Sequence, residues 1–183
     1  MTAALSPEQI QARIDKVNAA HNMIPADKLV RDLVRLFNLS AADEPDEFTF
    51  PAFSRPSRDR IFGGQIIAQA MMAAARTVEA DKQVHSLHAY FLRGGSEALP
   101  LHFRVHRDFD GRAFSNRRVV VRQEGKVIFN LTASFQKPEP GFSHQVPMPD
   151  LLPPEKCWDY SDAMARNPDV ADDMLERMAH PRP

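Results

Sequence analysis

Two neighbouring glycines, Gly63 and Gly64, stand just before the most apolar run of this 183-residue chain. From Ile66 to Ala75 only Gln69 is polar. The N-terminus of a helix presents unpaired N–H groups, and glycine lets a carbonyl or phosphate oxygen approach that backbone closely. The glycine pair therefore indicates either a ligand site at the mouth of a helix or a tight turn that permits close packing.

A second group of residues that could bind a ligand is basic. Residues 101–126 carry a local charge of +4, because seven cations face only three carboxylates. Such a run could hold the phosphorylated tail of a ligand, with Arg117 and Arg118 at its centre as candidates. The alternatives are a solvated strand face or partners for acidic residues near the C-terminus. The seven cations are Arg104, Arg107, Arg112, Arg117, Arg118, Arg122 and Lys126.

The histidines do not have the spacing of a metal site. His85 and His88 are three residues apart on an expected strand and point to opposite faces. His102 and His106 share a face but stand about 13 Å apart, which does not suit zinc. The 183 residues contain no Gly-x-Ser-x-Gly elbow and no phosphate-loop or dinucleotide motif. We therefore expect no metal and no resident cofactor.

The elements that must position these residues follow from periodicity. Ser6, Pro7 and Gln9 predict a capped helix to about residue 22, and a second helix is expected over 26–37. The apolar run predicts a buried helix after an extended piece at 48–53. Asp110-Gly111 and the short link 123–126 predict hairpins, so the sheet should be an antiparallel meander and the fold α+β. Strands are expected at 84–92, 101–109, 113–121 and 127–135.

The expected organisation is a helical extension over 1–45, one core domain over 46–145 and a linker over 146–183. The C-terminal segment is rich in proline and acidic residues, and proline cannot continue a sheet ladder. Its sequence therefore resembles a linker rather than a folded domain.

Composition indicates an ordinary globular protein. A formal net charge of −1 gives no global attraction to nucleic acid or anionic lipid. Cys157 is the single cysteine and cannot form an internal disulfide. From its first residues we expect no secretory leader, and the apolar run is shorter than the roughly 20 residues of a membrane helix. We expect a cytoplasmic protein without nucleic-acid or membrane partners.

Three long segments resemble the N-terminal half of the acyl-CoA thioesterase II family. The resemblance runs from about Leu29 to Met148 and is carried, in order, by RIFGGQIIAQAMMAAA, VHSLHAYFLRGG and SNRRVVVRQEGKVIFNLTASFQKPEPGFSHQ. It implies the hotdog fold, in which a curved antiparallel sheet wraps a long central helix. A wrapping sheet would explain why the apolar run lacks a polar face.

The resemblance also implies an activity and places its catalytic groups outside this chain. Family members are double hotdogs that hydrolyse acyl-CoA to free fatty acid and CoA, so CoA is part of the substrate rather than a cofactor. Their water-orienting aspartate, serine or threonine, and glutamine lie in the second unit, and no position here matches them. We therefore expect no catalytic residue in this chain, which should be the N-terminal unit and inactive alone.

The resemblance places five residues of this half near a substrate, and the basic run adds two arginines. The expected substrate-binding residues are Gly63, Gly64, Gln65, His85, Tyr90, Arg117 and Arg118. His85 is also a weak candidate for a general base. The expected partner is a second hotdog unit or a second copy of the chain. The alternative is a stand-alone, non-catalytic hotdog that binds acyl-CoA or pairs with a catalytic partner, and a hydratase-type hotdog is a weaker third option.

Overall fold

The computed structural model describes residues 5–21, 25–53, 60–158, 160–171 and 174–175. The chain divides into two compact units, which are described separately. One unit is Leu33–Phe142, and the other combines Met1–Asp32 with Ser143–Pro183.

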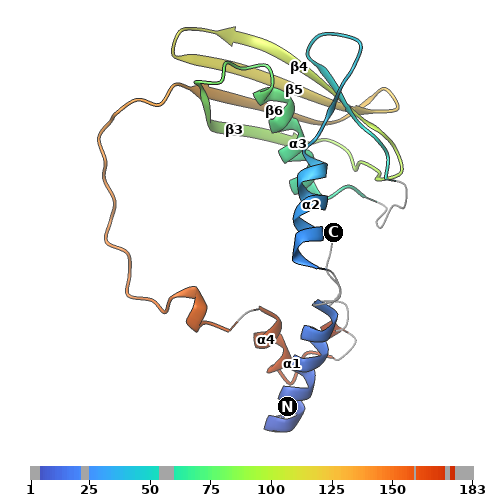
Figure 1. Ribbon diagram of the computed structural model, residues 1–183, viewed down its shortest axis with the longest axis vertical. Helices are drawn as coiled ribbons and strands as arrows, with labels where there is room; N and C mark the ends of the chain where they lie inside the picture. Colours follow the sequence, from blue (N-terminus) through green and yellow to red (C-terminus); the bar gives the residue numbers. More distant parts are fainter. Residues whose placement is uncertain (1–4, 22–24, 54–59, 159, 172–173, 176–183) are drawn as a thin grey trace. The chain divides into compact units, whose positions relative to one another are not determined.

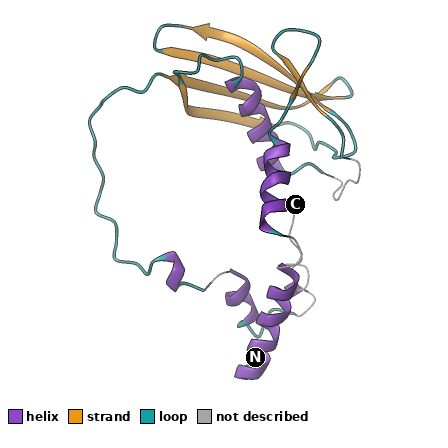
Figure 2. Ribbon diagram, in the orientation of Figure 1, coloured by secondary structure: helices purple, strands orange, loops and turns teal. Residues whose placement is uncertain are grey.

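The unit Leu33–Phe142 is built on a six-stranded antiparallel sheet. Helix α3 (Gly63–Ala75) packs against strands β4, β5 and β6 and crosses one face of the sheet (Figure 1 and Figure 2). This arrangement confirms the α+β class and the expected hotdog architecture. In spatial order the strands are β1 (Ser40–Ala41), β2 (Glu47–Phe50), β4 (Leu101–Asp110), β5 (Phe114–Gln123), β6 (Lys126–Gln136) and β3 (Gln83–Phe91).

The hairpins form where the turn residues predict them. Glu124 and Gly125 both have positive φ, 47° and 74°, which is the requirement of a two-residue type I′ turn. This turn sets the register between β5 and β6, with Gln123 opposite Lys126. The other hairpin closes with a bond from the Gly111 N–H to the Phe114 carbonyl at 2.8 Å. Chain-local turn chemistry therefore specifies the order of β4, β5 and β6. The expected meander does not extend to β3, which pairs with β6 rather than with β4.

Helix α3 is buried on one side only. Its sheet-facing residues are buried, whereas Met72 is 37% exposed and Ala75 is also exposed. The sheet therefore explains the missing polar face only in part, because the side of the helix that carries Met72 and Ala75 is apolar and exposed in the described part of the chain. The buried residues are Ile66, Gln69, Ala70, Ala73 and Ala74.

Gln69, the one polar residue of the apolar run, has a structural use. Its side chain is fully buried, and its Nε2 donates a 2.8 Å hydrogen bond to the carbonyl of Leu36. Leu36 is the last residue of helix α2 (Ala26–Leu36), whose final carbonyls lack partners within the helix. Gln69 therefore fastens the end of α2 to α3.

The second unit pairs helix α1 (Pro7–His21) with α4 (Tyr160–Ala165). The predicted capping box is confirmed, since Gln9 N–H donates to Ser6 Oγ and Ser6 N–H to Gln9 Oε1. The unit also holds a short 3₁₀ turn, η1 (Pro154–Lys156). Along the described residues, no helix combines the length and apolarity needed to cross a membrane.

Candidate ligand site at the start of helix α3

A cavity of about 400 Å³ opens beside the first turn of α3. Of the three residues expected at the helix mouth, Gly63 lines the cavity, whereas Gly64 and Gln65 are not among its lining residues. The remaining lining comes from Arg60 and Ile61, from residues 91–95, and from Ile66 and Ile128. The segments 60–63 and 91–95 are far apart in sequence and meet because β3 ends next to the helix mouth. The volume lies within the range of about 300–1,000 Å³ that is usual for small-ligand sites.

The helix mouth itself carries the glycine pair. No side chain of the described residues caps α3, and the first intrahelical bonds reach the Phe62 carbonyl from the N–H groups of Gln65 and Ile66. The N–H groups of Gly63 and Gly64 precede these bonds and belong to the unpaired first turn. A Cβ at position 63 would stand 3.2 Å from the ring of Phe91. Glycine at 63 therefore keeps the mouth open between helix and strand.

The loop 92–99 forms a fixed wall of the cavity. The side chain of Gln123, only 5% exposed, accepts a hydrogen bond from Ser96 N–H and donates to the carbonyls of Ser96 and Leu99. The Gly95 carbonyl accepts a 2.9 Å hydrogen bond from Ile61 N–H. These contacts join the loop both to β5 and to the segment before α3, so the cavity is preformed.

Two arginines, Arg60 and Arg93, line the cavity with the apolar residues. Arg93 Nη1 donates a 2.6 Å hydrogen bond to the Val127 carbonyl, which holds the guanidinium in place. The Arg60 side chain lies against Gly94, where an added Cβ would come within 3.5 Å of its Nε. Among the residues that the structure describes, neither guanidinium has a carboxylate within ion-pair distance.

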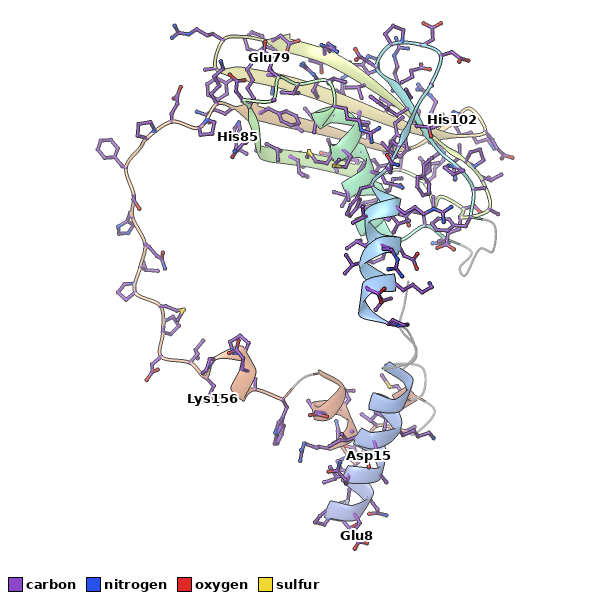
Figure 3. The ribbon with its side chains drawn as sticks, viewed as in Figure 1. Glu8, Asp15, Glu79, His85, His102 and Lys156 are labelled. Atoms are coloured by element: carbon purple, nitrogen blue, oxygen red, sulfur yellow. The ribbon has the colours of Figure 1, made fainter. Side chains whose placement is uncertain are left out.

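His85 and Tyr90 do not join the helix mouth. They lie on the outer side of β3, away from α3, where His85 Nε2 stands 2.8 Å from Ser134 Oγ and Tyr90 packs edge-on against His88. Ser134 alternates with residues of β6 that face the helix, so it belongs to the opposite face. Figure 3 places His85 and His102 at opposite ends of the sheet.

Arg117 is not available to a ligand. Its side chain is 1% exposed, and its five N–H groups all donate to protein oxygens. The acceptors belong to the turn after α3 and to the β4–β5 hairpin, so Arg117 fastens these two elements together. Its Nη2 contacts Asp110 Oδ1 at 2.6 Å, and this hydrogen bond lowers the pKa of the Asp110 carboxyl. Arg117 is therefore left out of the proposed site, because it has no donor to offer.

Most of the basic run is neutralised by neighbouring carboxylates. Arg118 lies on the opposite face of β5 from Arg117 and contacts Asp108 at 3.1 Å. The other ion pairs join the run to the segment 46–47, with Arg104 on Glu47 at 2.7 Å and Arg107 on Asp46 at 2.8 Å. The concentration of positive charge seen in the sequence is thus largely cancelled in space.

The sequence pattern did not predict Arg60 and Arg93 as site residues. They lie 33 positions apart, so no window of the sequence joins them. Each of them nevertheless lies shortly before a pair of glycines: Arg60 precedes Gly63-Gly64 in RIFGG, and Arg93 precedes Gly94-Gly95 in RGG. An arginine beside a glycine pair was the signal that could have found them.

The similarity to known proteins lies in the part of the chain that forms α3 and the long strands of the sheet. Residues 53–136 match the family described as acyl-CoA thioesterase N-terminal domain. Acyl-coenzyme A thioesterase 8 from Rattus norvegicus is 41% identical over 139 residues, which are 74% of this chain and 43% of that protein. Acyl-CoA thioesterase 2 from Haemophilus influenzae is 39% identical over 128 residues, 69% of this chain and 45% of its own length. The chain thus spans less than half the length of these relatives.

Solved structures are similar over the same part of the chain. Acyl-CoA thioesterase II TesB2 from Mycobacterium marinum is 40% identical with a TM-score of 0.59, over 67% of this chain and 45% of that one. A hot dog fold protein from Alicyclobacillus acidocaldarius, 22% identical with a TM-score of 0.59, covers 68% of this chain and 47% of its own and supports the fold alone. Residues 53–136 of this chain therefore form an acyl-CoA thioesterase N-terminal domain.

Proposed function

We propose that this chain is the first hotdog unit of an acyl-CoA thioesterase, which hydrolyses fatty acyl-CoA to free fatty acid and CoA. The observation that carries the proposal is the preformed cavity beside an uncapped helix start, in a domain of this family. In this proposal Gly63, Gly64 and Gln65 contact the substrate around its thioester oxygen, and His85 and Tyr90 do not. The single cysteine agrees with a cytoplasmic location.

We further propose that the chain hydrolyses thioesters only together with a second hotdog unit. The described residues that line the cavity include no Asp, Glu, His, Ser, Thr or Cys. A thioester needs an activated water or nucleophile, and none of the lining side chains can act as a general base. The cavity can therefore hold a ligand, while the catalytic group has to come from elsewhere.

The surface of the domain supports a partner of the same kind. β3 ends the sheet, so one of its edges has no strand partner among the described residues. Its α3-facing side exposes Val84, Leu87 and Phe91 by 45%, 47% and 57%, next to the uncovered apolar side of α3. An unpaired strand edge with apolar neighbours favours association with another strand.

The alternative remains a stand-alone hotdog that binds acyl-CoA without turning it over. The absence of a general base from the described lining of the cavity also favours such a binding protein. A single assay distinguishes the two functions. We would follow release of the CoA thiol from decanoyl-CoA by the pure chain, first alone and then joined to the second hotdog unit of an acyl-CoA thioesterase II.

The first proposal expects background hydrolysis by the chain alone and recovery of activity with the second unit. A turnover above about 1 per second by the chain alone would show that a residue of this half carries catalysis. No activity in the joined protein, despite intact folding of both units by circular dichroism, would favour the binding protein instead.

A further inference from the structure

The α4 segment, defined as residues 160–171, is folded although its helix is short. Helix α4 has only six residues, and an isolated helix of that length is unstable in water. Arg166 stacks on the ring of Trp158, with its guanidinium carbon 4.4 Å from the ring centroid, and the Asp169 N–H donates to Asn167 Oδ1 at 2.9 Å. These contacts shape the segment, but its stability has to come from another element.

Helix α1 supplies this support from the opposite end of the sequence. The side chain of Arg13 donates hydrogen bonds to the carbonyl of Asn167, at 3.3 Å, and to the carbonyl of Val170. Both carbonyls belong to the turn after α4, where backbone acceptors have no partner within a helix. Arg13 therefore fastens this turn from a position 154 residues earlier in the chain.

The same two elements bury the apolar side chains of their unit. Val170, whose carbonyl binds Arg13, is itself buried, so the polar and apolar contacts adjoin. Among the described residues this unit has four buried apolar side chains, against sixteen in the core of the hotdog unit, and a contact with so few should open at a lower free energy than the core. The four are Ile14, Ala165, Val170 and Leu175.

We propose that α1 is a clasp for the α4 segment, and that Arg13 and Ile14 hold it closed. The clasp gives the N-terminal extension a role that is independent of the proposed hydrolysis, because it uses no residue of the cavity beside α3. When the clasp opens, the α4 segment loses its fold while the sheet keeps its own. When it closes, the chain after the hotdog unit is held at a second point, which limits the reach of anything attached beyond it.

Hydrogen exchange of the full chain, followed by mass spectrometry at short labelling times, tests the clasp. Ile14→Asp should accelerate exchange in residues 162–171 at least about tenfold, and Arg13→Gln at least about threefold, while β4, β5 and β6 exchange as in the parent protein. Glutamine has nearly the helix propensity of arginine, so Arg13→Gln should leave α1 helical. Unchanged exchange in residues 162–171 in both variants, or equal acceleration over the sheet, would overturn the proposal.

Two further variants separate the contact from a general effect on α1. Gln11→Ala changes an exposed position that bonds Asp15 within the same helix, and it should leave exchange in the α4 segment unchanged. Arg13→Lys keeps the charge but lacks the fork of a guanidinium, so its effect should lie between those of arginine and glutamine. Equal acceleration by Gln11→Ala and Arg13→Gln would show that Arg13 does not hold the segment.

The single cysteine provides an independent readout next to the clasp. A nitroxide on the exposed Cys157 should give broader electron paramagnetic resonance lines in the parent protein than in Ile14→Asp, because opening frees the neighbouring chain. Identical line shapes would count against the clasp. An excess of unlabelled parent protein should not restore broad lines to labelled Ile14→Asp. Restoration would mean that α1 of a second copy holds the segment, and the clasp within one chain would be wrong.

Discussion

Arg117 and Arg118 are neighbours in sequence with opposite environments. Arg117 is buried and all of its N–H donors are hydrogen-bonded, whereas Arg118 is exposed and forms an ion pair with the carboxylate of Asp108. Arg117→Ala would leave the Thr77 and Phe109 carbonyls without these donors, so we expect a loss of about 3 kcal/mol in the free energy of unfolding. Arg118→Ala should cost about 1 kcal/mol or less, as exposed ion pairs do. Urea unfolding measures both, and equal losses would contradict the structural role of Arg117.

At the start of α3, Gly64 is a substrate contact if the proposed function is correct. The three atoms nearest to a Cβ at Gly64 all belong to the exposed ring of Phe62, the nearest at 2.6 Å, so the ring can move aside and the fold should be retained. Gly64→Val should nevertheless block approach to the first N–H groups. In the joined two-unit protein we expect about a hundredfold loss in kcat/KM, the usual effect of losing one well-placed donor.

The matched control for Gly64→Val is Gly141→Val. Nothing lies within 4 Å of a Cβ at Gly141, and its backbone conformation imposes no glycine. This control should keep full activity. Unchanged kcat/KM in Gly64→Val, with unchanged stability, would exclude the helix mouth as a substrate contact.

At the scale of elements, one side chain joins two helices. Gln69→Leu keeps the volume of the buried side chain but removes its bond to the Leu36 carbonyl at the end of α2. We expect a loss of about 1 kcal/mol and faster hydrogen exchange in residues 33–39, with the sheet unchanged. Gln65→Ala, which loses only a 3.5 Å contact, is the control. Uniformly faster exchange over β4–β6 would contradict a local role.

The β2–β4 junction predicts a dependence of stability on pH. Arg107 donates two hydrogen bonds to Asp46, and these lower the pKa of the Asp46 carboxyl below its usual value. A carboxyl with a depressed folded pKa stabilises the fold above its unfolded pKa of about 4, and this contribution is lost as pH falls through the folded pKa. Asp46 has a φ of 61°, which asparagine tolerates.

Asp46→Asn therefore tests the ion pair without straining the backbone. We expect a loss of up to about 1 kcal/mol at pH 7, which disappears when both proteins are unfolded by urea near pH 2. Lys137→Gln, at the exposed pair with Asp81, provides a comparison in which a smaller effect is expected. A difference for Asp46→Asn that persists unchanged at pH 2 would mean that charge is not its cause.

The domain as a whole should not remain a monomer in the absence of a second unit. Among the described residues, the outer edge of β3 has no strand partner and lies next to the exposed apolar side of α3, and apolar burial contributes about 25 cal/mol per Å². We expect a homodimer by sedimentation velocity. Leu87→Lys places a charge on the α3-facing side of β3 and should give a monomer, while Thr132→Lys, on the outer face of the sheet, should not. A dimer that survives Leu87→Lys would exclude this surface.

The sequence by itself determined the central helix and the four long strands of the hotdog domain, but not β1. The boundaries of β3 to β6 agree within two residues, because the alternation along each strand and the turn residues Glu124-Gly125 and Asp110-Gly111 act over short stretches of chain. The capping box at Ser6 is equally local. These features depend on backbone conformation and on neighbours a few residues away, so short sequence patterns are enough to predict them.

Only the tertiary structure decided which charged residues remain for a ligand. Arg117 could be recognised as inward-facing only once the register showed that it shares a face with buried Ser115 and Val119. Carboxylates from another part of the chain, such as Asp46 in the turn before β2, neutralise a basic run that looks free in the sequence. Arg60 and Arg93 meet at the helix mouth because the β3 crossover returns the chain there. Pairing across the sheet depends on contacts between distant segments, and local patterns do not contain them.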